Sequence, residues 1–280
     1  MYDNTGMNKA AIKQVTNHYY RSLKKYFKQI IPGLDVEKIH QFRIAYKKLR
    51  AFLRMLSQDQ DNANPIKIAK NLKKSYHIAG AIRDLQLQRM RIADATKRKL
   101  KKTPAYLILL QQEIKTLAQQ LDSISLEKPV TGCKKKTDPL LPKHFPVKRF
   151  KNFVNGKWAA IYPIISSRRI SDVNIHFIRK SLKDLFYNGK IYKETKQEPG
   201  ALLLWKEKEI DQLLDELGIF QDKCAAIALL KSYGFSSLNE SNQQLLEGMQ
   251  IEWIKDKLAL KKLLIKKLKT TVFPTQPFRT

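Results

Sequence analysis

Cysteine is nearly absent from this chain of 280 residues, which has Cys133 and Cys224 alone. Neither lies at a spacing typical of metal ligands, and two thiols so far apart do not indicate a disulfide framework. We therefore expect a reducing, cytoplasmic location. The first residues show no charged segment followed by an apolar run, so we also expect no signal peptide.

Long apolar runs and the loops of common enzymes are missing as well. The stretch 201–205 is typical of the longest apolar runs, whereas a membrane-spanning helix needs about 20 apolar residues. No Gly-x-x-x-x-Gly-Lys loop occurs, and no carboxylate cluster accompanies the basic stripes. We therefore expect no membrane span, catalytic residue, metal or cofactor, and a protein that is not an enzyme.

Acidic residues are scarce. The chain has 25 Asp and Glu against 54 Lys and Arg, a formal net charge of +29. This excess is far larger than solubility requires, and it indicates a polyanionic partner: nucleic acid, an anionic membrane surface or a phosphate polymer. The hydrophobic fraction of 43% is ordinary for a globular protein and too high for a disordered basic tail.

Helical periodicity dominates the rest of the pattern, and the few Gly and Pro residues punctuate it. Pro32 and Gly33 close the first expected helix, and Asp35 can cap the second. The expected helices are 7–31, 36–57, 65–95 and 104–122 in a first half (7–122), then 147–168, 172–190, 199–231 and 238–270 in a second half (147–270). A Pro-bearing linker at 123–146, which holds the run Lys134, Lys135 and Lys136, joins the halves, and a tail follows at 271–280.

The two halves repeat a pattern. Gly80, Arg83 and Asp84 correspond to Gly218, Gln221 and Asp222, with glycines and aspartates 138 residues apart, and His40 and His176 are 136 apart. The sequence therefore predicts an all-α fold, a single domain over 1–280 made of two four-helix bundles with pseudo-twofold internal symmetry. We expect the bundles to pack around a basic groove or channel.

One face of an expected helix in each half is cationic. At 100° per residue, His40, Arg43, Lys47, Arg50 and Arg54 share an arc of about 80°, with an apolar face opposite. The apolar face comprises Phe42, Ala45, Leu49, Phe52 and Leu56. The second-half face comprises His176, Arg179, Lys180, Lys183, Tyr187 and Lys190, opposite Ile175, Ile178, Leu182, Leu185 and Phe186. Lys67, Lys70, Lys74 and His77 extend the basic surface of the first half, whereas Asp211, Asp215 and Asp222 make the equivalent second-half stripe acidic.

Each feature has a second interpretation. A single basic stripe could be a solvated face, and each histidine could be a core or capping residue, but two matched stripes favour an anion-binding role. Asp84 and Asp222 could orient cations behind the site or form a buried ion pair between helices. Gly80 and Gly218 cost about 1 kcal/mol each relative to Ala within a helix, which close helix packing would explain.

The ordered motifs His-x-x-Arg-x-x-x-Lys-Lys-Leu-Arg and Gly-x-x-Arg-Asp resemble the CHAD family, the conserved-histidine α-helical domain. The match runs over roughly 7–270. The resemblance implies two four-helix bundles with pseudo-twofold symmetry and inorganic polyphosphate bound between them, at polyphosphate granules in some members. Asp184 and Phe186 depart from the family pattern, which would usually carry more basic residues after Lys183. These two residues lower the share of the binding site that we expect the second half to contribute.

Polyphosphate binding is therefore the first prediction. Nucleic-acid binding is the alternative, although no helix-turn-helix or zinc module occurs and Phe42, Tyr46 and Phe52 belong better to the core than to base stacking. The residues expected to bind polyphosphate are His40, Arg43, Lys47, Lys48, Arg50, Arg54, Lys70, Lys74, His77, Arg83, His176, Arg179, Lys180 and Lys183, with Asp84 and Asp222 orienting the cations from behind.

Overall fold

The computed structural model describes residues 6–57, 66–98, 104–124, 127–196, 207–230, 232, 235–271 and 273, and they are almost entirely helical. The all-α prediction is confirmed. The helices are α1 (Lys9–Ile30), α2 (Val36–Leu56), α3 (Lys70–Arg98), α4 (Pro104–Asp122), α5 (Glu127–Thr137), α6 (Val147–Ser166), α7 (Asp172–Lys196), α8 (Glu207–Leu229) and α9 (Glu240–Thr270), with short 3-10 turns η1 (Asp138–Leu140) and η2 (Phe235–Ser237).

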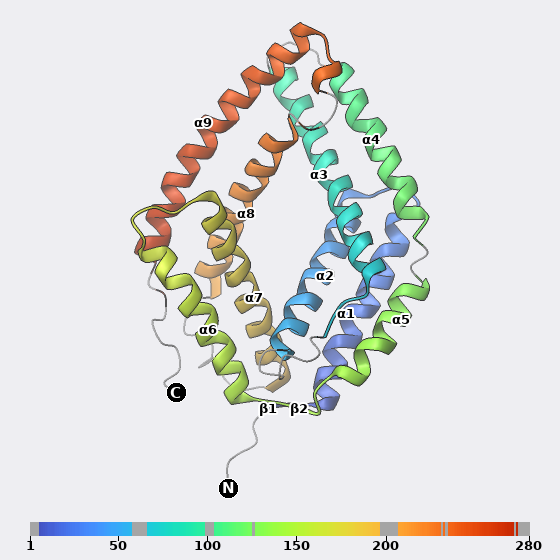
Figure 1. Ribbon diagram of the computed structural model, residues 1–280, viewed down its shortest axis with the longest axis vertical. Coiled ribbons are helices and arrows are strands. Elements are labelled where there is room, and N and C mark those ends of the chain that lie inside the picture. The colour runs from blue at the N-terminus through green and yellow to red at the C-terminus, as the bar shows by residue number, and fades with distance from the viewer. Residues whose placement is uncertain are drawn as a thin grey trace.

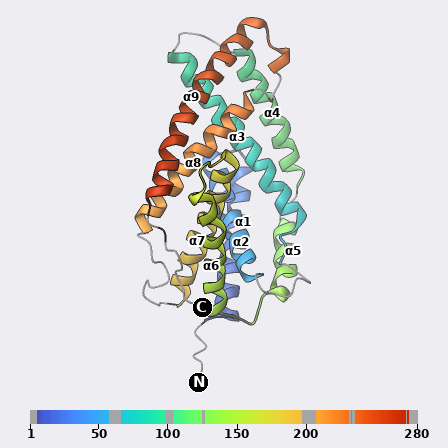
Figure 2. The same ribbon diagram turned by 60° about the vertical axis from the view of Figure 1, so that its left-hand side comes forward.

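The helices form an inner and an outer set (Figure 1). The inner set is α2 and α3 from the first half and α7 and α8 from the second. The halves meet through equivalent helices, because α2 packs against α7 and α3 against α8. Figure 2 shows α3 and α8 crossing where they meet. Closed four-helix bundles and an internal twofold axis stay predictions.

Short side chains begin several helices. Asp35 accepts a hydrogen bond of 2.8 Å from the backbone N–H of Lys38 and so caps α2, as the sequence predicts. Asn8 and Asn239 cap α1 and α9 in the same way. The caps fix where each helix begins, and therefore which of its residues face inward.

The expected apolar faces of α2 and α7 are confirmed. Phe42, Leu49 and Phe52 of α2 are fully buried, as is Ile178 of α7. All members of the two faces are buried: Phe42, Ala45, Leu49, Phe52 and Leu56 on α2, and Ile175, Ile178, Leu182, Leu185 and Phe186 on α7. Both α2 and α7 therefore turn one side to the core and leave the other for their basic residues.

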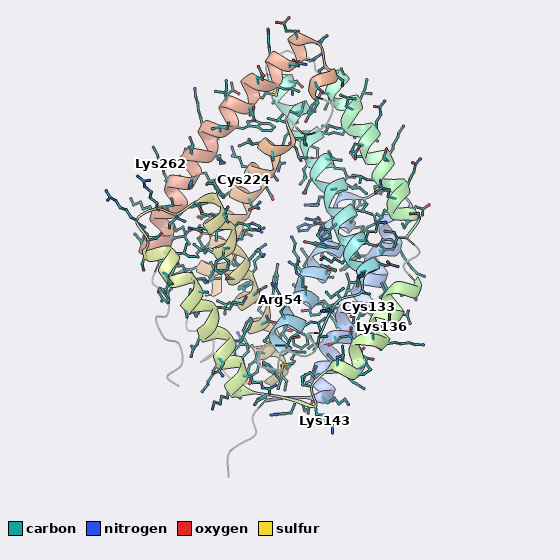
Figure 3. The ribbon with its side chains drawn as sticks, viewed as in Figure 1. Arg54, Cys133, Lys136, Lys143, Cys224 and Lys262 are labelled. Atoms are coloured by element: carbon teal, nitrogen blue, oxygen red, sulfur yellow. The ribbon has the colours of Figure 1, made fainter. Side chains whose placement is uncertain are left out.

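The segment 123–146 is more structured than a simple linker. It contains α5, which packs against α1 and α3 through the buried Val130 and Cys133. The Tyr20 hydroxyl shares a 2.8 Å hydrogen bond with Thr137 at the end of this helix. Lys135 and Lys136 lie on its exposed side, and Figure 3 shows Lys136 at the outer edge of the molecule. The lysine run therefore lies apart from the inner helices.

Two three-residue strands were not predicted. The strand β1 (Gly6–Asn8) pairs antiparallel with β2 (His144–Pro146), opposing Met7 to Phe145. A Cβ at Gly6 would overlap the carbonyl oxygen of Phe145, so the approach of the strands requires glycine. Three residues are too few to show the period of two from which strands are recognised.

The third helix begins later than expected. It starts at Lys70, and the backbone N–H groups of Ile66 and Ala69, ahead of it, donate to the Ser57 hydroxyl and the Cys133 sulfur. Pro65 and the first residues of the expected helix 199–231 lie outside the described residues, and the described part of that helix is α8.

Candidate functional site

The inner helices enclose a cavity of about 540 Å³. All four of them contribute side chains, and most of the polar ones are cationic. The cavity is lined by the cations Arg43, Lys47, Arg50 and Arg54 of α2 and Arg179, Lys180 and Lys183 of α7, by the imidazoles of His77 of α3 and His176 of α7, and by the carboxylates Asp84, Asp184 and Asp222. The basic faces of the two halves therefore meet, as the matched stripes predict.

A narrower cavity of about 300 Å³ continues from the first. The two share lining residues from all four inner helices: Arg43, Lys47, Asp84, Arg179, Lys183, Tyr187 and Asp222. The narrower part adds the guanidinium of Arg83 and the imidazole of His40, and also the exposed carboxylates Asp211 and Asp215. We call the two parts together the central cavity. One of its sides is mainly cationic and the other is mixed in charge.

Most of the residues predicted to bind an anion line the central cavity. The exceptions are Lys48, Lys70 and Lys74. Lys70 and Lys74 are exposed on α3 and line none of the cavities described in this protein, and Lys48 faces a different cavity, between α1 and α7. On α3 the stripe therefore reaches the central cavity at His77 and not at the two lysines that precede it, which helical phasing within one helix could not show.

Each helix glycine of the repeat lies beside the arginine of its own half. A Cβ at Gly80 would overlap the guanidinium of Arg43, whereas a Cβ at Gly218 would lie 3.7 Å from Nη2 of Arg179. For Gly80 the close packing that the sequence predicts is thus between α3 and the Arg43 side chain of α2, whereas the contact at Gly218 would be an ordinary one. This contact also explains why the His-x-x-Arg and Gly-x-x-x-Asp motifs occur together.

An aromatic pair supports two of the arginines. The rings of Tyr46 and Tyr76 are stacked with their centroids 4.1 Å apart. The guanidinium of Arg43 lies 5.1 Å from the Tyr76 centroid, and that of Arg50 lies 5.9 Å from each ring. Such cation–π contacts contribute about 0.5–1 kcal/mol or more each and orient the guanidinium plane. Tyr76 was not among the predicted residues, because its partner ring lies on another helix.

Two lysines face each other across the halves. Burial, together with the neighbouring Arg43, lowers the pKa of Lys47 to about 7, and burial together with Arg179 lowers that of Lys183 to about 8. Among the described residues, neither ammonium has a carboxylate within the 4.0 Å of an ion pair. Near neutral pH the protein therefore holds these amines only partly protonated.

Asp184 joins the halves. Its carboxylate, nearly buried, accepts hydrogen bonds from Arg54 Nη2 of α2 at 2.8 Å and from Lys157 Nζ of α6 at 3.0 Å. Figure 3 shows Arg54 near the end of α2, between the halves. The departure of Asp184 from a basic pattern is therefore explained by an ion pair with the opposite half, which also neutralises Arg54 in part.

The two histidines have equivalent neighbours. His176 Nδ1 donates to Gln221 Oε1 at 2.6 Å, and Gln221 corresponds in the repeat to Arg83. Burial, with a smaller effect of Arg83, lowers the pKa of His40. Arg83 Nη1 itself donates to the backbone carbonyl of Val36 at 2.7 Å, in the first turn of α2. His40 thus lies near Arg83, and His176 lies beside Gln221. These two residues directly precede the motif aspartates Asp84 and Asp222.

Asp84 and Asp222 face the central cavity. Within the described parts of the chain, neither forms an ion pair of 4.0 Å or less, so the hypothesis of a buried ion pair between helices is not met there. Burial raises the pKa of Asp84, and the nearby Arg43 opposes that shift. Both carboxylates therefore lower the positive potential of the central cavity, but neither is paired with one particular cation among the described residues.

No helix in the described parts of the chain is both long enough and apolar enough to cross a membrane. No group of three or more His, Cys, Asp or Glu side chains there is arranged to hold a metal ion.

Comparisons with known proteins give a family and a fold. Residues 14–231 match the model of the CHAD domain. The crystal structure of the CHAD domain from the plant Ricinus communis is similar, with 16% identity, a TM-score of 0.62, and 95% of this chain and 88% of that chain covered. PptA from Streptomyces chartreusis gives 11% identity, a TM-score of 0.64, and coverage of 94% and 99%. No curated protein matches.

Proposed function

The chain belongs to the CHAD family, and from that premise we propose that its central cavity binds inorganic polyphosphate, a long linear polyanion. The main supporting observation is that both halves direct cations into one cavity: Arg43, Lys47 and Arg50 from α2, and Arg179 and Lys183 from α7. Concentrating these charges is unfavourable without a counterion: burial first, and the neighbouring arginines second, lower the pKa values of Lys47 and Lys183.

Two arginine donors support an anionic ligand. The Nε–H groups of Arg50 and Arg179 are buried, and no acceptor within the described residues bonds to them. A buried donor without an acceptor costs about 1–3 kcal/mol. Phosphate oxygens are suitable acceptors, and guanidinium groups bind them in bidentate geometry. A phosphate chain would satisfy these donors while it neutralises the charge.

The aromatic residues favour polyphosphate over nucleic acid. Binding of single-stranded nucleic acid relies on aromatic rings that stack on bases. In the central cavity Tyr76 is stacked on Tyr46 and covered by Arg43 and Arg50, so these two rings already have partners on their faces. Polyphosphate has no bases and needs cations alone.

We propose a binding role and no catalytic one. The central cavity contains His40 and His77 of the first half and His176 of the second beside arginines and lysines, a set suited to holding phosphate groups. The proposal also places the protein in the cytoplasm, at polyphosphate granules, as the family resemblance implies. Fluorescence microscopy of the tagged protein with a polyphosphate stain would test the location, and a diffuse signal in granule-bearing cells would contradict it.

A competition experiment tests the ligand. Labelled long-chain polyphosphate is bound to the protein and displaced with unlabelled polyphosphate or with single-stranded DNA of matched total charge, at one salt concentration. Polyphosphate should displace the label at a concentration at least tenfold lower than DNA does. Equal or better displacement by DNA would overturn the assignment. Affinity should also fall linearly with the logarithm of salt concentration, as for other polyanions.

A further inference from the structure

A third cavity, of about 580 Å³, lies between α1 and α7, and we call it the side cavity. Its lining includes the cationic residues Arg21, Lys48 and Lys190, together with His18, and the single carboxylate Glu194. Lys48 is one of the three predicted anion-binding residues that do not reach the central cavity, and it lines the side cavity instead. The proposed function does not account for this second group of cations.

The side cavity adjoins the central one through two aromatic residues of α7. Tyr187 lines the side cavity and both parts of the central cavity, and Phe186 lines the side cavity and the narrower part. These rings therefore form the wall between the two spaces. The same helix carries Lys183 in the central cavity and Lys190 in the side cavity, two turns or about 10 Å apart.

The lysines of the side cavity rest on this wall. The ammonium of Lys190 lies 4.2 Å from the centroid of the Phe186 ring, and that of Lys48 lies 5.7 Å from the Tyr187 centroid. Cation–π contacts of this kind restrain otherwise flexible amines. The two positive charges are therefore held next to the place where a chain would leave the central cavity.

We propose that the side cavity is a second binding site for the same linear polyphosphate. A chain seated in the central cavity continues past Tyr187 and binds Lys48 and Lys190, with Arg21 and His18 at the exposed rim on α1. The exposed Asp211 and Asp215 make the α8 side of the narrower part repulsive to the polymer, which favours this route along α7. The inference rests on the proposed function.

The proposal makes affinity depend on chain length. Tripolyphosphate, with three phosphoryl groups, is accommodated by the central cavity and gains nothing from the side cavity. A chain of many phosphates contacts both groups of cations at once, and linked contacts strengthen binding without a new site of higher intrinsic affinity. Removing the side-cavity charges should therefore weaken long chains selectively.

The test compares two double variants by isothermal titration calorimetry with tripolyphosphate and with long-chain polyphosphate. Lys48→Gln/Lys190→Gln removes two charges from the side cavity. Lys115→Gln/Lys262→Gln removes two exposed charges, from α4 and from the outer side of α9, that line none of the three cavities (Figure 3). Circular dichroism confirms that both variants are folded to the same extent as the unmodified protein.

We expect the side-cavity variant to bind long chains about tenfold more weakly and tripolyphosphate within twofold of the unmodified protein. The slope of its log affinity against log salt concentration should correspond to about two fewer phosphate contacts than the slope of the control variant. A loss for long chains no larger than that of the control variant would overturn the inference, as would an equal loss for both ligands. Failure of the unmodified protein to bind either ligand would instead contradict the proposed function itself.

Discussion

In the first half, Arg43 of α2 presses against Gly80 of α3, and in the second half Arg179 of α7 lies near Gly218 of α8 with more room around it. The backbone arrangement repeats, but the neighbours differ. The guanidinium of Arg43 also lies over the Tyr76 ring. The first half carries a second arginine, Arg83, three residues after Gly80, whereas the second half has Gln221 at the equivalent position. The repeat thus fixes where each arginine lies, and its surroundings decide how firmly each is held.

The largest expected difference comes from removing the arginines. Arg43→Ala should weaken polyphosphate binding about 10- to 100-fold, because a hydrogen bond to a charged group contributes about 1.5–3 kcal/mol. Arg179→Ala should weaken it less, because fewer cations of its half surround it. Calorimetric titration of both variants measures the ratio. An equal loss for Arg179→Ala would show that the halves contribute alike, and a larger one that the second half contributes more; either outcome would contradict the expectation.

The glycine variants should give the next largest difference in polyphosphate affinity between the halves. Gly80→Ala places a methyl group on the Arg43 guanidinium, so affinity should fall about tenfold as that side chain moves. Gly218→Ala places its methyl group at ordinary contact distance from Arg179, so affinity should stay within twofold. Its free energy of unfolding should rise by up to about 1 kcal/mol, as Ala favours a helix over Gly. Chemical denaturation and titration of both variants check the pair.

The pH dependence of polyphosphate affinity distinguishes the halves, because each half contributes one lysine with its own lowered pKa. A bound polyanion stabilises the charged amines, so binding takes up protons above the pKa values of the empty cavity, about 7 for Lys47 and about 8 for Lys183. Affinity should therefore fall as pH rises from 7 to 9, by up to about tenfold per unit for each lysine. Lys47→Arg should flatten the profile from about pH 7 and Lys183→Arg from about pH 8, because arginine stays charged.

Stability should change in the opposite direction. Because the pKa of each lysine is lower in the folded protein than in the unfolded chain, the unfolded chain binds more protons between about pH 7 and 10. The free energy of unfolding of the ligand-free protein should therefore gain a contribution that grows with pH over this window. Denaturation with and without polyphosphate at pH 7 and 9 measures both trends, and a parallel change would contradict the linkage.

The histidines should show the smallest difference. Burial keeps the pKa of His40 low, so its ring contributes little charge at neutral pH. His40→Ala should change affinity by less than about threefold at pH 7.5, well below the effect of Arg43→Ala. His176→Ala removes the hydrogen bond to Gln221 and serves as the matched variant. A tenfold loss in either would assign the histidine a direct contact that charge alone does not explain.

Sequence reasoning located the residues of single helices better than contacts between helices. Helical phasing placed Arg43 and Arg179 on faces opposite Phe42 and Ile178, and those faces are observed. Phasing could not show that Lys74 would face solvent or that Tyr76 would lie under Arg43, since both depend on how α3 is rotated against α2. The ion pair of Asp184 with Arg54 could not be predicted for the same reason, because the two residues lie 130 positions apart on different helices.

The sheet of β1 and β2 has a mechanical consequence. It ties the residues before α1 to those before α6, so the first half is fastened to the start of the second at a point far from the α3–α8 crossing. The cavity thus lies in a frame closed at both ends, and its width cannot change by a simple hinge about one joint. A polymer can therefore enter the cavity only if side chains move while both contacts stay in place, or if the β1–β2 sheet separates first.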